Sequence, residues 1–128
     1  MSPVPSPRGD PVCDSSSVDL QVSTREESGR TVVAATGEVD VYTAPVLDEE
    51  LTRLTDAGAS SLVVDLSGVD FLDSTGLSVI VKALEAVRPR DGRIDVVVAA
   101  ERVAKVFRIT GLDEMVTLHR SLDDALAG

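Results

Sequence analysis

The sequence predicts an α/β fold, a sandwich of a mixed β-sheet and helices, with about five strands and about four helices in the order β-β-α-β-α-β-α-β-α. Two observations carry this prediction. Short β-branched runs alternate along the chain with Leu- and Ala-rich segments of helical spacing. The hydrophobic fraction is 43% but only 2% of the residues are aromatic, so Val, Leu, Ile and Ala must build the core. The 128 residues allow one domain and a short tail.

The N-terminal tail is predicted from composition. Residues 1–17 hold four of the six prolines and five serines. Such a segment cannot bury enough apolar surface to offset the entropy lost on ordering. We therefore expect a disordered tail over 1–17 and a folded domain over 18–128.

An antiparallel hairpin is expected at the start of the domain. Val18, Leu20 and Val22 alternate with polar neighbours, which is the period of a half-buried strand. A turn-like segment at 27–30 and a β-branched run at 31–36 follow, which completes the hairpin pattern.

The first helix is expected after residue 43. Thr43 is a suitable N-cap, and Pro45 is tolerated in a first helical turn. The apolar residues that share one helical face are Leu47, Leu51 and Leu54. Gly58 is expected to end the helix.

A parallel βαβ unit is expected next. The run 61–66 is of buried-strand type, a loop is expected at 67–73, and apolar residues recur at helical spacing over 77–87. The run 94–99 is the next strand. Strands joined by a helix of this length are parallel, and the connection is right-handed.

The remaining elements are short. A helix is expected over 103–110 and is ended by Gly111, and an edge strand is expected at 116–118. Ser121 begins a pattern that resembles a capping box, which predicts a final helix through Ala127.

Two segments that follow predicted strands carry unusual chemistry, namely 37–40 and 70–77. In the second, Asp73 is placed to cap the helix, which puts Ser74 and Thr75 in its first turn beside unpaired backbone N–H groups. A phosphate on Ser74 would lie at the positive end of the helix dipole, so the helix should survive modification.

Phosphorylation at Ser74 would change the surface. It adds a charge of roughly −1.5 to −2. A partner surface packed against Ser74 would lose about 3–4 kcal/mol, which weakens binding several hundred-fold. Gly76 is expected to leave the first turn open to a partner's backbone. The alternative is that Asp-Ser-Thr-Gly is an ordinary helix start with no switching role.

The motifs extend well beyond this loop. They comprise Gly37-Glu38-Val39-Asp40 followed by Thr43-Ala44-Pro45, then Val63-Val64-Asp65-Leu66 with Val69 to Leu77, then Val103 to Phe107 with Thr110-Gly111-Leu112. In this order and spacing they resemble the STAS-domain family, specifically the bacterial anti-sigma factor antagonists, over about residues 18–127. The N-terminal extension is the departure from the compact family members.

The resemblance implies a phosphorylation switch. Ser74 stands at the serine that a partner anti-sigma factor with serine kinase activity phosphorylates, with Thr75 as a secondary acceptor. The unphosphorylated family members bind the anti-sigma factor and release the sigma factor, and a serine phosphatase resets the phosphorylated form. The residues expected to bind the partner are Glu38, Asp40, Asp73, Ser74, Thr75, Gly76 and Leu77.

Composition disfavours several other functions. The net charge is −10 and the pI is about 4.4, so neither nucleic acid nor an anionic membrane surface is an expected partner. Cys13 is the only cysteine, which is consistent with a reducing cytoplasm. No signal peptide or membrane-spanning run is recognised. We expect no cofactor and no metal, and a monomer or weak dimer.

Three rival interpretations stay open at this point. Asp40, Asp65, Asp70 and Asp73 could hold Mg²⁺, although Asp more often caps helices or serves turns. His119 could serve a serine hydrolase, but no nucleophile-elbow motif is present. The third is a constitutive STAS scaffold subunit of a stress-signalling or transport assembly, in which Ser74 is only part of a cap.

Overall fold

The fold was analysed in a computed structural model, which describes residues 20–127. In chain order the elements are β1 (Leu20–Glu27), β2 (Arg30–Val39), α1 (Ala44–Asp56), β3 (Ser61–Leu72), α2 (Ser74–Val87), the short 3-10 helix η2 (Arg88–Arg90), β4 (Arg93–Val97), α3 (Glu101–Thr110), the 3-10 helix η3 (Leu112–Glu114), β5 (Thr117–His119) and α4 (Leu122–Ala127). The predicted order of strands and helices is confirmed. The predicted tail at 1–17 lies outside the described residues and stays a prediction.

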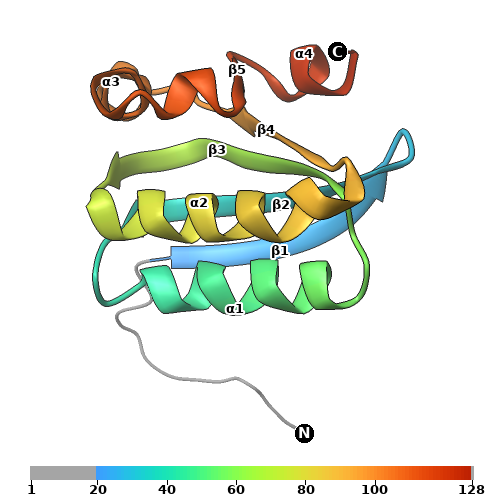
Figure 1. The fold of residues 1–128 in the computed structure, drawn as a ribbon. Coiled ribbons are helices and arrows are strands. Elements are labelled where there is room, and N and C mark those ends of the chain that lie inside the picture. The colour runs from blue at the N-terminus through green and yellow to red at the C-terminus, as the bar shows by residue number, and fades with distance from the viewer. Residues whose placement is uncertain (1–19, 128) are drawn as a thin grey trace, which may run out of the picture.

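The strands form one mixed sheet in the order β1-β2-β3-β4-β5. β1 and β2 pair antiparallel as the predicted hairpin, and β2, β3, β4 and β5 run parallel to one another. Since parallel strands joined by helices all end at the same edge, the segments after β2 and β3 are neighbours. Figure 1 shows this edge on the left, where α1 and α2 both begin.

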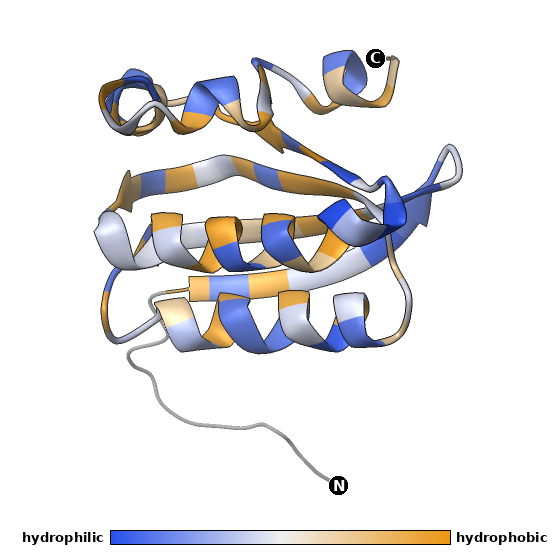
Figure 2. Cartoon of the chain, viewed as in Figure 1, coloured by the Kyte–Doolittle hydropathy of each residue, from blue (hydrophilic) through white to orange (hydrophobic). Residues whose placement is uncertain are grey.

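The main core lies between the sheet and the helices α1, α2 and α3. It is aliphatic, as composition predicts, and Leu47, Leu51 and Ile80 are almost completely buried in it. The hydropathy colouring shows apolar stretches on the strands and alternating apolar and polar turns on α1 and α2 (Figure 2). The opposite face of the sheet carries a smaller cluster, in which Ala125 of α4 packs on Val32, Val63 and Val97.

The prediction of a loop at 67–73 is wrong for most of this segment, because residues 67–72 belong to β3. β3 continues to Leu72 and pairs with the end of β2, with irregular register near Thr36 and Gly37. Gly68 permits this pairing, because a Cβ atom there would lie 2.8 Å from Thr36 Oγ1. Gly and Ser are typical of turns in sequence, but here they lie where β2 and β3 approach closely.

The described residues contain no helix long and apolar enough to cross a membrane.

Candidate functional site

The candidate site lies where β2 and β3 end side by side. Val39 pairs with Leu72, and the backbone N–H of Asp73 donates to the Val39 carbonyl at 3.1 Å. The next residue of each segment is therefore placed at the same edge of the sheet. This brings the two predicted motifs, 37–40 and 70–77, together in space.

Asp73 caps α2 as predicted. Its backbone is extended, and its Oδ1 accepts hydrogen bonds from the N–H groups of Thr75 at 2.9 Å and Gly76 at 3.3 Å. These are N–H groups that the first turn of a helix leaves without a partner inside the helix. The carboxylate thus fixes where the first turn of α2 begins.

Ser74 is the first residue of α2 and is exposed, whereas Thr75 is half-buried. The contact that Ser74 makes in this turn uses its backbone carbonyl, which accepts from Ser78 Oγ at 3.0 Å. The cap is made by Asp73, so the Ser74 hydroxyl is not needed to start the helix. Of the two hydroxyls, that of Ser74 is the more accessible to an enzyme.

The Asp40 side chain closes the turn that leads into α1. Asp40 Oδ1 accepts from the N–H groups of Tyr42 at 2.9 Å and Thr43 at 3.0 Å. Thr43 occupies the N-cap position but makes no capping hydrogen bond, and its hydroxyl donates instead to the Glu38 carbonyl at 2.8 Å. Thr43 is thus the N-cap residue, as predicted, but its side chain does not cap the helix, because its hydroxyl is used by the Asp40 N–H and the Glu38 carbonyl.

Gly76 faces the protein's own core. It is buried, and a Cβ atom at this position would lie 2.7 Å from Val39 Cγ1 and 3.1 Å from the Leu72 side chain. The expectation that Gly76 leaves room for a partner is therefore wrong. The glycine instead lets α2 approach the ends of β2 and β3. Leu77 is also buried, with 7% of its surface exposed.

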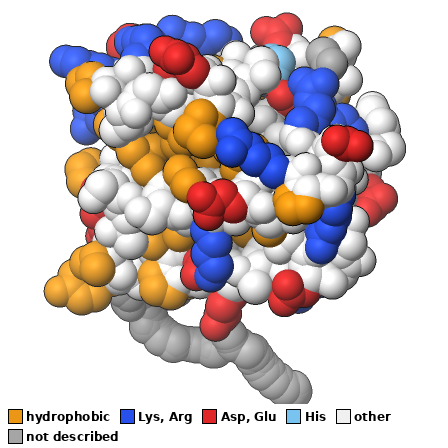
Figure 3. Space-filling view, in the orientation of Figure 1, with side chains coloured by type: hydrophobic (Ala, Val, Ile, Leu, Met, Phe, Trp, Pro, Cys, Tyr) orange, Lys and Arg blue, Asp and Glu red, His pale blue; other side chains and the backbone are white. Residues whose placement is uncertain are grey.

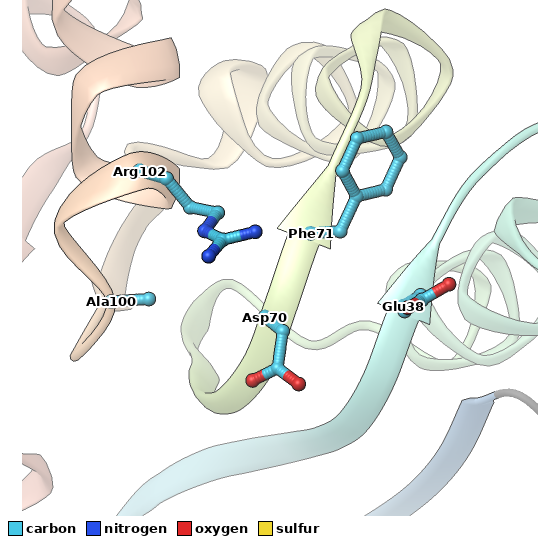
Figure 4. A pocket seen from close by; sticks show the side chains of 5 residues that line it. All are labelled: Glu38, Asp70, Phe71, Ala100 and Arg102. Atoms are coloured by element: carbon cyan, nitrogen blue, oxygen red, sulfur yellow. The ribbon is translucent and has the colours of Figure 1, made fainter.

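An open hollow of about 420 Å³ lies beside the end of β3. Its lining residues are Glu38, Asp70, Phe71, Ala100 and Arg102. Figure 4 shows the Asp70 and Phe71 side chains projecting from the end of β3, with the Arg102 side chain extending from α3 towards the strand. Asp70 is an exposed strand residue, so its predicted turn role is wrong. Sequence reasoning did not single out Arg102, which has no local motif.

Exposed apolar side chains flank the site at the start of α1. Val41 is 59% exposed, Tyr42 is 85% exposed and Val46 is 46% exposed. In the space-filling view, apolar side chains gather at the lower left, over this part of the molecule (Figure 3). The sequence analysis missed these residues, although two apolar residues directly after a turn-forming Asp are an available signal.

A second hollow, of about 400 Å³, runs along α2. It is lined by Leu77, Ser78, Val81, Lys82, Glu85, Thr110, Leu112 and Met115. Although mostly buried, Leu77 therefore contributes to a surface depression on the side of α2 that faces η3. The surface around Ser74 thus combines acidic groups, exposed apolar groups and two hollows, as protein-binding surfaces do.

The side chains that a metal site or a serine hydrolase would require lie far apart in the structure or make other contacts. Asp65 lies inside β3, where its Oδ1 accepts from the Ser67 hydroxyl at 2.6 Å. His119 lies in β5, with its Nε2 atom 3.5 Å from Asp95 Oδ1. Within residues 20–127, no three His, Cys, Asp or Glu side chains converge as metal ligands. His119 Nε2 thus lies near Asp95 of β4 but makes no hydrogen bond within the described residues. Asp40, Asp65 and Asp73 serve separate local contacts.

Comparison with protein families identifies one match over most of the chain. A family model described as the STAS domain matches residues 21–125. The anti-sigma-B factor antagonist of Staphylococcus aureus is 31% identical over 106 residues, which cover 83% of this chain and 98% of that protein. The protein of the same name from Staphylococcus epidermidis has the same identity and coverage.

Solved structures agree with this match. An anti-sigma factor antagonist from Mycobacterium paratuberculosis is similar with a TM-score of 0.80 and 32% identity, over 88% of this chain and 96% of that one. The anti-sigma factor antagonist SpoIIAA in its unphosphorylated form has a TM-score of 0.71 at 16% identity, over 83% of this chain and 93% of that one. The second similarity concerns the fold alone.

Proposed function

Because the chain belongs to the STAS domain family and, within it, to the anti-sigma factor antagonists, we propose that phosphorylation of Ser74 controls its binding to an anti-sigma factor. Unphosphorylated, the protein binds an anti-sigma factor and thereby releases a sigma factor in the cytoplasm. The anti-sigma factor is also a serine kinase. It transfers the γ-phosphoryl group of ATP to Ser74 Oγ, with release of ADP and of the hydroxyl proton.

A serine phosphatase completes the proposed cycle. Water hydrolyses the phosphoserine to serine and inorganic phosphate, which restores the binding form. The protein itself acts by binding and has no catalytic step in this scheme. Thr75 is half-buried in the same turn and is the secondary acceptor.

The exposed position of Ser74 on an independently capped helix is the observation that carries the proposal. Because Asp73 supplies the cap, Ser74 can be modified without removing a bond that the helix needs. A phosphate there lies at the positive end of α2, so the fold tolerates it. The same phosphate places roughly −1.5 to −2 charges on the contact surface.

This added charge is expected to weaken the complex. A partner that packs apolar or acidic groups against Ser74 must then bury an unpaired phosphate or leave water in the interface. The switch therefore changes the surface, while the fold stays as it is.

The rival function is a STAS scaffold without a switch. It predicts that Ser74 matters through the helix start alone. The hydrogen bonds at the start of α2 support the switch over this alternative, because the Asp73 carboxylate makes the cap and the cap does not use the Ser74 hydroxyl.

The test combines the purified protein with ATP, Mg²⁺ and each anti-sigma factor kinase of the source organism. Intact mass and site mapping follow phosphorylation, and titration calorimetry follows binding before and after it. We expect one phosphate on Ser74 and binding that is several hundred-fold weaker afterwards, equivalent to about 3–4 kcal/mol.

Ser78→Ala is the matched control, since Ser78 is an exposed serine one turn further along the same helix. Ser74→Ala should abolish phosphorylation and keep tight binding, whereas Ser78→Ala should be phosphorylated normally. A protein that binds tightly, gains no phosphate and is indifferent to Ser74→Asp would be the scaffold instead.

A further inference from the structure

The turn that joins β2 to α1 exposes apolar residues at its centre. Asp40 and Thr43 are its first and last residues, and the Thr43 N–H donates to the Asp40 carbonyl at 3.2 Å. The two central residues are Val41 and Tyr42, which are 59% and 85% exposed. Central positions of surface turns usually carry Gly, Asn, Asp, Ser or Pro, for conformational and solvation reasons. Turn conformation and solvation therefore do not explain a valine and a tyrosine at these positions.

The turn is held firmly by its own hydrogen bonds. Asp40 Oδ1 accepts from the Tyr42 and Thr43 N–H groups, and the Ala44 N–H donates to the Asp40 carbonyl at 2.8 Å. The Thr43 hydroxyl accepts from the Asp40 N–H at 2.9 Å and donates to the Glu38 carbonyl. Hydrogen bonds of the residues on either side of it thus hold the backbone at Tyr42 in place in the unbound protein.

A fixed backbone with an exposed aromatic side chain is well suited to binding. Tyr has few rotatable bonds and a large apolar surface, so little conformational entropy is lost when it is buried. Preorganisation of this kind lowers the cost of association. Val46, which is 46% exposed in the first turn of α1, extends the apolar surface.

We propose that the turn Asp40–Thr43 is a preformed anchor, whose Val41 and Tyr42 side chains insert into an apolar pocket of the anti-sigma factor. This inference rests on the proposed function. The pocket is expected to have basic groups at its rim, because the acidic residues Glu38 and Asp40 adjoin Val41 and Tyr42 in the chain. The anchor supplies affinity and selects the partner, while Ser74 controls release.

The anchor is continuous with the switch. The N–H of Asp73, the residue before Ser74, donates to the carbonyl of Val39, the residue before Asp40. The helices that follow the two segments, α1 and α2, lie side by side, and Lys82 Nζ is 3.2 Å from Asp48 Oδ1 between them (Figure 1). A partner surface of ordinary size that contacts Ser74 therefore also reaches Tyr42.

The anchor and the phosphorylation site should affect different kinetic constants. Tyr42 does not touch the atoms that react during phosphoryl transfer, so its loss should weaken association without slowing the chemical step. Tyr42→Ser is expected to raise the dissociation constant for the anti-sigma factor about 30-fold, as for an aromatic hot spot. The KM for phosphorylation of Ser74 should rise with it, and kcat should stay within about twofold.

The experiment uses the 128-residue chain and the purified anti-sigma factor that phosphorylates Ser74. Calorimetry gives the dissociation constant, initial rates give KM and kcat, and circular dichroism verifies folding. Tyr42→Phe is the matched variant, because it keeps the ring and removes only the hydroxyl; it should retain binding within about threefold. Since Tyr42 is 85% exposed, Tyr42→Ser should fold normally.

The possible outcomes separate the two proposals. If the wild-type chain is phosphorylated on Ser74 and Tyr42→Ser binds as tightly as wild type, the anchor is wrong and the switch stands. If Tyr42→Ser instead abolishes self-association in sedimentation and leaves partner affinity unchanged, the turn joins copies of this chain and the anchor is again wrong. If no anti-sigma factor binds the wild-type chain, both proposals fail.

Discussion

Asp73 and Ser74 divide two tasks between adjacent side chains. Asp73 accepts the two N–H hydrogen bonds that start α2, and Ser74 presents an exposed hydroxyl in the same turn. If one residue performed both tasks, phosphorylation would remove the cap along with the binding surface. Under the proposed switch, this division would let the chain change its partners while its fold is retained.

This division predicts different effects on stability. Asp73→Ala should lower the free energy of unfolding by about 1 kcal/mol, as expected for a lost N-cap. Ser74→Ala should change it by less than about 0.5 kcal/mol, since its hydroxyl is exposed and the cap remains. Urea unfolding of the unphosphorylated proteins measures both. Equal losses in the two variants would show that the Ser74 hydroxyl contributes to the cap after all.

Among the elements, α2 depends most on close packing. Its first turn lies against the ends of β2 and β3, and Gly76 is the residue that allows this approach. In an exposed helix, exchanging Gly for Ala usually stabilises the protein by up to about 1 kcal/mol. At this position the gain is outweighed, because Val39 and Leu72 occupy the space that a methyl group requires.

We therefore expect Gly76→Ala to destabilise the protein by about 1–3 kcal/mol, as overpacking does. The shift of α2 that relieves the clash should also weaken binding at Ser74. Ser78→Ala is the control on the same helix, since it is exposed and should be neutral within about 0.5 kcal/mol. Thermal and urea unfolding report the difference. A Gly76→Ala protein that is more stable than wild type would contradict this packing.

On the scale of the whole molecule, a buried carboxylate joins elements that are distant in sequence. Asp95 in β4 is fully buried and pairs with Arg30 of β2 and with Arg93, whose Nη2 atom lies 2.8 Å from Asp95 Oδ1. Arg30 Nη1 also donates to the Ala125 carbonyl of α4 at 2.8 Å. One network thus holds the C-terminal helix on the second face of the sheet, away from the Ser74 edge.

The same network predicts acid sensitivity. Burial by itself raises the pKa of Asp95, but hydrogen bonds from Arg93 and Arg30 outweigh burial and hold the pKa below its usual value. A carboxyl whose pKa is lower in the folded state stabilises the fold above the unfolded-state pKa, about 3.9. That contribution should fall progressively as pH drops below about 4–5 and through the folded-state pKa.

Asp95→Asn should lower the free energy of unfolding at pH 7 by about 3–5 kcal/mol, because Arg30 is left largely buried without its charge partner. The variant should also lose less stability than wild type on acidification. Glu27→Gln is the control, since its pair with Arg25 is exposed and contributes at most about 1 kcal/mol. Urea unfolding between pH 7 and pH 3 tests this, and parallel pH profiles for wild type and Asp95→Asn would refute it.

Features that depend on near neighbours in the chain can be predicted from the sequence alone. The order of strands and helices follows from apolar periodicity, and the Asp73 cap follows from the residues directly after it. The exposed place of Ser74 follows from that cap. These signals are reliable because the hydrogen bonds and periodicities involved span only a few residues.

Features that depend on partners distant in the chain are visible only in the folded protein. Ser67 to Leu72 form a strand because β2 supplies their hydrogen bonds, and Gly76 is needed because Val39 approaches it. Likewise, Tyr42 is exposed because nothing in the described fold packs over its turn, and Asp95 tolerates burial because Arg30 is brought beside it. No local pattern contains these contacts, since each joins residues that only folding brings together.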